Sequence, residues 1–228
     1  MAEIRLLRHG ETSGYEGDLG LSDRGRDQAR AAAAALTTEA HGSLTLLYAT
    51  SVRARVTAEV LAEDLKAAGV TVDGPRAERE FANFTVAAGA NVREQAEVFG
   101  EYAGAADTPL DELPGWLADI ARFRHVHVSG GDPIALWLTT PLLGFEPPAV
   151  SVRRYWRGIR AAAGAELTVV AAHSGPMRAL VAHAFARDLG EPDNLEAVAI
   201  HLEGARARVD FRGQRAKISV PELDEPRW

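Results

Sequence analysis

Three short apolar runs stand out in the pattern of hydrophobic and polar positions along the chain. They occupy residues 4–7 (IRLL), 44–49 (LTLLYA) and 167–172 (LTVVAA). Continuous apolar runs of this length are typical of strands that are buried on both faces of a parallel sheet.

A helical pattern follows each of these runs. After the first, Ser22 is expected to cap a helix over about 23–36. After the second, apolar residues at helical spacing predict a helix that Gly69 ends, and after the third, Pro176 suits the first turn of a helix and Gly190 its end. Alternation of strands and helices predicts an α/β fold with right-handed crossovers.

The remainder of the chain divides into a C-terminal strand region and a central segment. Strands are predicted at 197–202 and 207–212, and the second, which alternates, is expected at the edge of the sheet. The segment from about 81 to 150 has no clear strand period, and helices are expected in it around 91–103 and 111–123. We therefore predict one domain over the whole chain, 1–228, with the central segment as an insertion packed over one end of the sheet.

Composition narrows the classes of protein to which the chain can belong. Of its 228 residues, 46% are hydrophobic and 25% charged, as in ordinary globular proteins. The net charge of −7 disfavours a general nucleic-acid-binding surface. The chain has no cysteine, which excludes disulfides and thiolate chemistry. No apolar run approaches the roughly 18 residues of a membrane span, and no signal-like segment opens the chain, so we expect a cytoplasmic location without membrane partners.

Basic and imidazole side chains follow the carboxyl ends of the three predicted strands. His9 follows the first strand, His173 follows the third, and Arg53 lies at the start of the helix after the second. Ligands of open α/β sheets bind outside these strand ends. With Arg8, this rim would hold a phosphate dianion, since each guanidinium can bind two oxygens. The helix start at Ser174 would add backbone N–H groups, unless Ser174 merely caps that helix.

The adjacent arginine and histidine suggest nucleophilic chemistry. A neutral imidazole nitrogen is a nucleophile, and neighbouring arginines lower the pKa of His9. We expect Gly10 to let the backbone turn sharply, a backbone carbonyl to fix Nδ1 of His9, and Nε2 to face phosphorus. His173 would then stabilise charge on the phosphoryl oxygens.

Four segments, in order along the chain, resemble motifs of one enzyme family, the histidine phosphatase superfamily. They are LLRHGET (6–12), LSDRGRDQA (21–29), RARVTAEVLA (53–62) and VVAAHSGPMRAL (169–180). Members of this family include cofactor-dependent phosphoglycerate mutases and many phosphomonoesterases. The resemblance implies a phosphoglycerate mutase-like fold, in which a mainly parallel central sheet is flanked by helices on both faces and a helical insertion lies over the active site.

The resemblance also implies roles for individual residues. His9 would be the phosphorylated nucleophile, and Arg8, Arg53 and His173 would complete the phosphate pocket. No metal or other cofactor is implied.

The general acid of the family is a glutamate that follows the third strand-like segment. Here RAEREFANF (76–84) resembles that place, and Glu80 is the better match, with Glu78 as the fallback. The chain departs from the family pattern at Tyr15, where many members have an asparagine, and the segment after Glu80 lacks the usual glycine and tryptophan-glutamate-glycine.

These observations predict a metal-independent phosphomonoesterase that acts on a small phosphorylated metabolite through phosphohistidine. Two alternatives stay open at this point. One is mutase-type phosphoryl transfer, which the short, altered loops disfavour. The other is a catalytically silent, phosphate-binding regulatory protein of the same fold. A homodimer through a sheet edge or the insertion is also left open.

Two further clusters have a surface interpretation and a functional one. His125 and His127 alternate as on a strand face, and without a third ligand they are expected to be polar surface, not a metal site. Four arginines between 153 and 160 are expected on the solvated face of a helix, although one of them could reach a second anionic group of the substrate.

Overall fold

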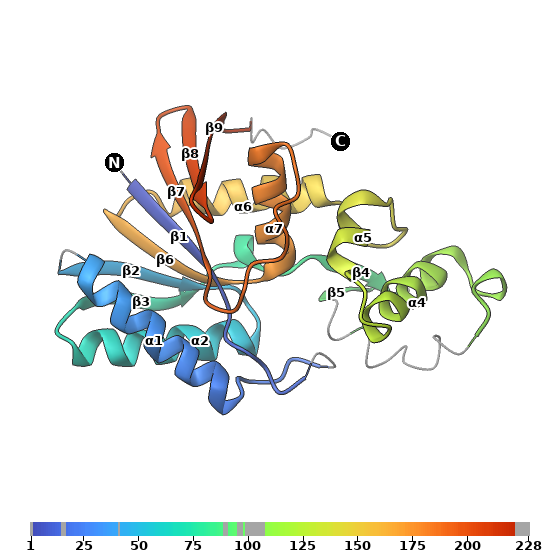
Figure 1. The fold of residues 1–228 in the computed structure, drawn as a ribbon, viewed down its shortest axis with the longest axis horizontal. Coiled ribbons are helices and arrows are strands. Elements are labelled where there is room, and N and C mark those ends of the chain that lie inside the picture. The colour runs from blue at the N-terminus through green and yellow to red at the C-terminus, as the bar shows by residue number, and fades with distance from the viewer. Residues whose placement is uncertain are drawn as a thin grey trace.

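The computed structural model describes residues 2–14, 17–40, 42–88, 91–94, 98 and 108–221. Its centre is a seven-stranded sheet in the order β3-β2-β6-β1-β7-β8-β9 (Figure 1). These strands are β1 (Ala2–Arg8), β2 (Ser43–Tyr48), β3 (Thr71–Ala77), β6 (Leu167–Ala172), β7 (Ala197–Glu203), β8 (Arg206–Phe211) and β9 (Gln214–Ser219).

Strands β3, β2, β6 and β1 run parallel, and β7, β8 and β9 continue the sheet as an antiparallel meander. The three apolar runs of the sequence form β1, β2 and β6. The central strand β6 is buried along its whole length, as its apolar sequence predicts.

Helices cover both faces of the sheet (Figure 1). The helices α1 (Asp23–Glu39) and α2 (Val52–Ala67) pack together on one face, and α6 (Pro148–Ala161) and α7 (Ser174–Phe185) pack together on the other. The predicted α/β class, with a parallel core between helices, is confirmed. Within the described residues, no helix combines the length and apolar character that crossing a membrane requires.

The ends of the helices follow local capping chemistry. The backbone N–H of Gly25 donates to Oγ of Ser22 at 3.0 Å, which confirms the predicted cap of α1. Gly69, with φ +85°, follows α2 as expected. Helix α7 ends at Phe185, earlier than the predicted end at Gly190, because Ala186 adopts the left-handed conformation with φ 53°.

The sheet has two strands that the hydrophobic pattern did not reveal. Strand β3 contains Gly74-Pro75 and lies at one edge, where a proline is tolerated. Strand β9 lies at the other edge and alternates between exposed and half-buried positions. The prediction that 207–212 is the edge strand is therefore wrong, since β8 pairs with β7 on one side and with β9 on the other.

The central segment forms a smaller lobe beside the carboxyl ends of the parallel strands (Figure 1). It contains the hairpin of β4 (Thr85–Ala88) and β5 (Asn91–Glu94), the 3-10 turn η3 (Leu110–Glu112), and the helices α4 (Gly115–Val128) and α5 (Pro133–Thr139). Its role as an insertion within a single domain stays a prediction.

The helices expected in this lobe differ from those observed. The helix expected around 91–103 is wrong at 91–94, which form β5, and most of its remainder lies outside the described residues. The helix expected at 111–123 begins later, after Pro114, and extends to Val128. The lobe is packed around aromatic side chains, which leave no periodic pattern in the sequence. Phe84, for example, stacks on Trp137 with ring centroids 4.4 Å apart.

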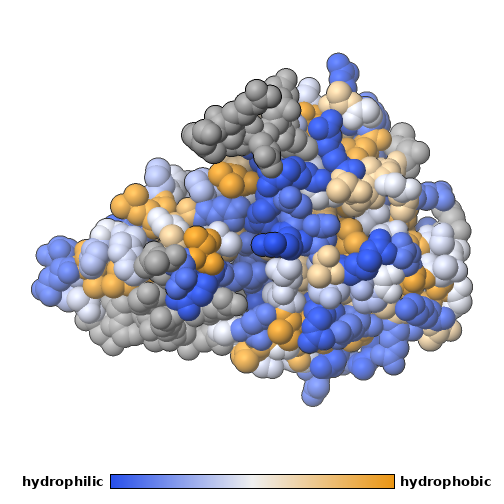
Figure 2. Space-filling view, turned by 180° about the vertical axis from the view of Figure 1, so that it is seen from behind, coloured by the Kyte–Doolittle hydropathy of each residue, from blue (hydrophilic) through white to orange (hydrophobic). Residues whose placement is uncertain are grey.

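Hydrophilic surface predominates at the centre of the face seen from behind, and apolar residues on it are scattered in small groups (Figure 2). A mixed surface of this kind is ordinary for a globular protein. The features that suggest chemistry lie instead at the carboxyl ends of the parallel strands.

Gly10 is required by a close backbone approach and not by a sharp bend, which corrects the sequence-based interpretation. A Cβ atom on Gly10 would lie 2.5 Å from the carbonyl oxygen of Gly25, in the first turn of α1. The two glycines thus let β1 and α1 meet directly behind His9.

Gly10→Ala is expected to lower the free energy of unfolding by about 3 kcal/mol, because backbone would have to move to relieve the contact. Thermal or urea unfolding measures this loss. Gly164→Ala is the matched control, since a Cβ there meets nothing within 4 Å. Equal stability of the two variants would contradict the packing argument.

Candidate active site

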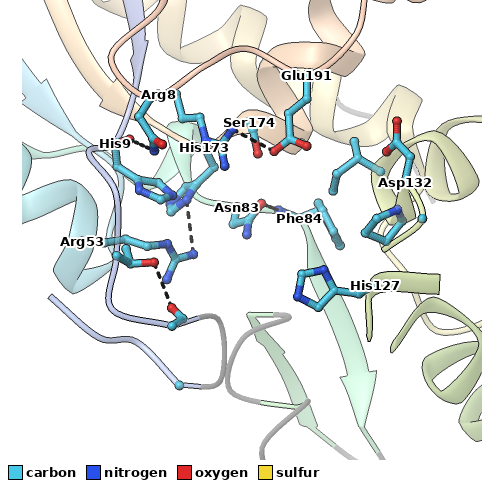
Figure 3. Close-up of a pocket in the computed structure, with 18 residues that line it drawn as sticks. Arg8, His9, Arg53, Asn83, Phe84, His127, Asp132, His173, Ser174 and Glu191 are labelled. Carbon is cyan, nitrogen blue, oxygen red and sulfur yellow. Dashed lines mark hydrogen bonds and ion pairs between the residues drawn. The ribbon is translucent and has the colours of Figure 1, made fainter. Parts of the chain in front are cut away.

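A cavity of about 470 Å³ lies where β1, β2 and β6 end (Figure 3). The strand ends and adjoining loops contribute Arg8, His9, Thr12, Arg53, His173 and Ser174. The smaller lobe and the segment leading into it contribute Asn83, Phe84, His127, Asp132, Pro133 and Ile134, and the loop after α7 contributes Glu191 and Asn194. The five residues predicted to bind and attack phosphate are therefore brought together.

His9 is buried at the end of β1 with one ring nitrogen engaged. Its Nδ1 lies 2.8 Å from the carbonyl oxygen of Gly10. Because a carbonyl can only accept, Nδ1 carries the proton and Nε2 of the neutral ring keeps its lone pair. Asn194 fixes the backbone, since its Nδ2 donates to the carbonyl oxygen of His9 at 2.8 Å.

The surroundings of His9 keep its imidazole neutral. Burial is the main cause, and the charges of Arg53 and Arg8 add to it, lowering the pKa of His9 from 6.5 to about 3. The sequence suggested the arginines as the cause, whereas desolvation by the surrounding fold contributes more. An unprotonated imidazole at neutral pH is the form that can attack phosphorus.

The lowered pKa of His9 predicts a specific acid sensitivity. The unfolded chain binds a proton at His9 below about pH 6.5, whereas the folded chain binds it only near pH 3, so stability is lost as the pH falls through this window. The expected slope from His9 is about 1.4 kcal/mol per pH unit, measured by urea unfolding at several pH values. His9→Ala should show a shallower slope than the native chain, and identical slopes would contradict the burial of a neutral ring.

His173 lies against His9, with ring centroids 5.4 Å apart. Nη2 of Arg53 donates to Nδ1 of His173 at 3.3 Å, and because that nitrogen accepts, Nε2–H donates to Oγ of Ser51 at 3.2 Å. Burial, followed by the charge of Arg53, lowers the pKa of His173 well below its usual value. His9 and His173 are therefore both neutral.

Arg8 and Arg53 bring two permanent positive charges to the cavity. Nη1 of Arg8 donates to the carbonyl oxygen of Pro192 at 2.7 Å and lies 3.1 Å from the carboxylate of Glu191. Nε of Arg8 is buried and has no hydrogen-bond partner among the described residues. A buried donor without a partner costs free energy, and an anionic oxygen in the cavity would satisfy it.

Arg53 is held by two carboxylates. Its Nη1 donates to Oδ1 of Asp18 at 2.9 Å, and its Nη2 lies 3.5 Å from the carboxylate of Glu94. Asp18 also accepts the backbone N–H of Val52 at the start of α2. These contacts fix the guanidinium beside His173.

Ser174 is the first residue of α7, so the N-terminus of this helix borders the cavity. The alternative in which Ser174 caps the helix is wrong, since His173 occupies the N-cap position without a side-chain cap.

The structure does not bring Glu80 or Glu78 into the cavity. Glu80 lies in the 3-10 segment η1 (Arg79–Phe81), and its carboxylate accepts a hydrogen bond from Nε of Arg157, on α6, at 3.2 Å. Glu78 accepts the backbone N–H of Glu80 and so caps that turn. Neither lines the cavity, where the same segment instead presents Asn83 and Phe84.

One of the four arginines of α6, Arg154, has a structural role. Arg153, Arg157 and Arg160 are exposed, as expected of a solvated helix face. Arg154 instead points inward, donating to the carbonyl oxygens of Glu80, Ala82 and Asn83 and to the carboxylate of Glu146. The guanidinium of Arg154 thus holds in place the segment that carries Asn83 and Phe84.

The histidine pair at 125 and 127 lies on a helix, α4, and not on a strand as expected. His127 lines the cavity on the side opposite His9 (Figure 3). Within the described part of the chain, no group of three or more potential ligands is arranged to hold a metal ion.

Comparison with known proteins identifies the family. The family described as Histidine phosphatase superfamily (branch 1) matches residues 4–123, just over half of the chain. The chain belongs to the histidine phosphatase superfamily. His173 lies beyond the matched range and reaches the cavity by way of β6.

Several solved structures share the fold. The mycobacterial glucosyl-3-phosphoglycerate phosphatase in complex with VO3 is 21% identical, with a TM-score of 0.60, over 92% of this chain and 98% of that one. YhfR of Bacillus stearothermophilus is 15% identical, with a TM-score of 0.60, over 93% and 97%. A putative alpha-ribazole-5'-P phosphatase of Escherichia coli is 17% identical, with a TM-score of 0.54, over 97% of each chain. No curated protein sequence matches the chain.

Proposed function

We propose that this chain is a metal-independent phosphatase that hydrolyses small phosphomonoesters through a phosphohistidine at His9. The observation that carries the proposal is the buried, neutral His9, whose Nδ1 is held by Gly10 and whose Nε2 is left to attack. The family and the named phosphatases among the similar structures support the reaction class.

The proposed reaction has two displacements. Nε2 of His9 attacks phosphorus, the N–P bond forms, and the ester P–O bond breaks as the leaving oxygen takes up a proton. Water then attacks phosphorus, the N–P bond breaks, and phosphate leaves with His9 neutral again. Both steps gather negative charge on the phosphoryl oxygens.

Arg8 and Arg53 are proposed to hold that charge. The buried, unpartnered Nε of Arg8 would donate to one oxygen, and the fixed guanidinium of Arg53 would face another. We assign the N-terminus of α7 at Ser174 to the same oxygens, and we assign His173 to them on the basis that its Nε2–H exchanges Oγ of Ser51 for a phosphoryl oxygen when substrate binds. Donors fixed before the substrate arrives need no reorganisation during the reaction.

The cavity is larger than a phosphate group requires, which favours an ester with an organic leaving group of metabolite size. Mutase-type transfer is less favoured, because a phosphoglycerate would need a cation for its carboxylate. Among the described lining residues, only Arg8 and Arg53 are arginine or lysine, and the proposal assigns both to phosphate.

The test is release of phosphate from p-nitrophenyl phosphate by the purified chain in excess chelator. The proposal expects a rate that is proportional to chain concentration and unchanged by chelator. A rate that chelator removes and added metal restores would contradict metal independence. Release of nitrophenol without free phosphate, with the phosphoryl group found on an added alcohol, would favour transfer over hydrolysis. Absence of turnover, with phosphate still bound, would favour the catalytically silent alternative.

A further inference from the structure

The proposed reaction needs a proton donor for the leaving oxygen, and the glutamates that the sequence suggested lie outside the cavity. Among the described residues, the carboxylates that line the cavity are Asp132 and Glu191. A general acid must reach the leaving oxygen, so these two are the first candidates.

Asp132 is held in its ionised form by hydrogen-bond donors. It accepts from Nη1 of Arg178 at 2.8 Å and from the backbone N–H of Ala135 at 2.9 Å, and so caps α5. The hydrogen bond from Arg178 keeps the pKa of Asp132 below its usual value. A carboxylate held in this way is a poor proton donor.

The two carboxylates on Arg53 are also poor candidates. Both oxygens of Asp18 accept hydrogen bonds, one from the backbone of Val52 and one from Arg53. Glu94 contacts Arg53 at 3.5 Å but does not line the cavity.

Glu191 has the required placement. Its carboxylate contacts Arg8 at 3.1 Å, is about one-third exposed, and points into the cavity from the loop that follows α7 (Figure 3). A phosphate held by Arg8 would therefore share one guanidinium with Glu191. Arg178, which holds Asp132, does not line the cavity, whereas Arg8 does, so a dianionic ester would compete with Glu191 for its cation. A carboxyl group next to negative charge and without its cation is the kind that can hold a proton and donate it.

We propose that Glu191 is the general acid of this enzyme, in place of the glutamate that follows the third strand in its family. The inference rests on the proposed phosphatase reaction. The proton moves from the Glu191 carboxyl to the ester oxygen as the P–O bond breaks. In the second displacement the resulting carboxylate takes a proton from the attacking water, which returns Glu191 to its starting form.

The test compares two esters that differ in how much they need an acid. Phenyl phosphate expels a basic phenolate, which needs protonation, whereas p-nitrophenyl phosphate expels a weakly basic one. The value of kcat/KM covers the steps up to phosphoryl transfer and so reports this expulsion. In Glu191→Gln, kcat/KM for phenyl phosphate should fall about 10²-fold more than that for p-nitrophenyl phosphate.

The differential separates acid catalysis from loss of the Arg8 contact. A variant that merely disturbs Arg8 would lose phosphate binding, and kcat/KM would fall equally for both esters. Equal losses in Glu191→Gln would therefore overturn the inference, and so would a differential loss seen in Glu80→Gln or Glu94→Gln instead.

These outcomes are distinct from failure of the proposed function. If His9→Ala removes hydrolysis of both esters while Glu191→Gln lowers both equally, the phosphatase assignment stands and the acid assignment falls. If the native chain hydrolyses neither ester, both assignments fall.

Discussion

His9→Ala is expected to lower kcat/KM for p-nitrophenyl phosphate by about 10⁴-fold or more, the scale on which loss of a catalytic nucleophile acts in other enzymes. The expectation follows from geometry, since the imidazoles of His9 and His173 have different partners. Both nitrogens of His173 are engaged by Arg53 and Ser51, whereas Nε2 of His9 remains available. Steady-state hydrolysis at saturating and subsaturating substrate measures the loss.

His183→Ala is the matched control, because His183 is an exposed histidine on α7 outside the cavity. It should keep the native rate. Circular dichroism and thermal unfolding of His9→Ala show whether the chain remains folded. A folded His9→Ala variant within tenfold of the native rate would place the nucleophile elsewhere.

Arg53→Gln is expected to lower kcat/KM by about 10²- to 10³-fold, the usual cost of removing one fixed donor to a developing charge. Arg53 is only 7% exposed and orients His173 as well as facing the proposed phosphate position. Its loss also leaves Asp18 and Glu94 without their shared cation, which would repel a dianionic ester. Binding of inorganic phosphate, measured by calorimetry, should weaken in parallel.

Arg55→Gln provides the control from the same helix. Arg55 is exposed and pairs with Glu59 four residues on, a contact worth well under 1 kcal/mol. The rate and phosphate affinity of this variant should match those of the native chain. Similar losses in both arginine variants would show that charge on α2, and not the placement of Arg53, is what matters.

The parallel core was predictable because buried strands and capped helices leave strong local signals. Strand β6 is apolar at every position and is buried throughout, and the Ser22 cap is visible in the sequence. The edge strands were missed because an edge strand has little burial to impose a pattern. In β3, Gly74-Pro75 even suggests a break.

The end of the cavity that is proposed to bind phosphate was predictable for a related reason. Arg8, His9, Arg53 and His173 directly follow strands or begin a helix, so topology alone places them at one rim. The close approach of Gly10 to Gly25 depends on two segments meeting in three dimensions, and sequence reasoning replaced it with a local bend.

The opposite wall of the cavity could not be derived in this way. His127 reaches it from a helix whose start depends on Pro114, and Asn83 reaches it because Arg154 ties down three neighbouring carbonyl groups. Glu80 was expected to be the general acid in the cavity, but the short turn η1 and the pairing with Arg157 direct it away. Only the negative charge in the loop after α7 offered a signal for Glu191, and it does not differ from an ordinary surface charge.

Covalent trapping of the intermediate is the direct test of phosphohistidine formation at His9. The native chain is mixed rapidly with a phosphomonoester, quenched in alkali, digested and analysed for phosphopeptides. One phosphate is expected on the peptide that carries His9, stable in alkali and lost in acid as expected of an N–P bond, and absent from His9→Ala. An acid-stable phosphate on a serine or threonine, or a label that persists in His9→Ala, would contradict it.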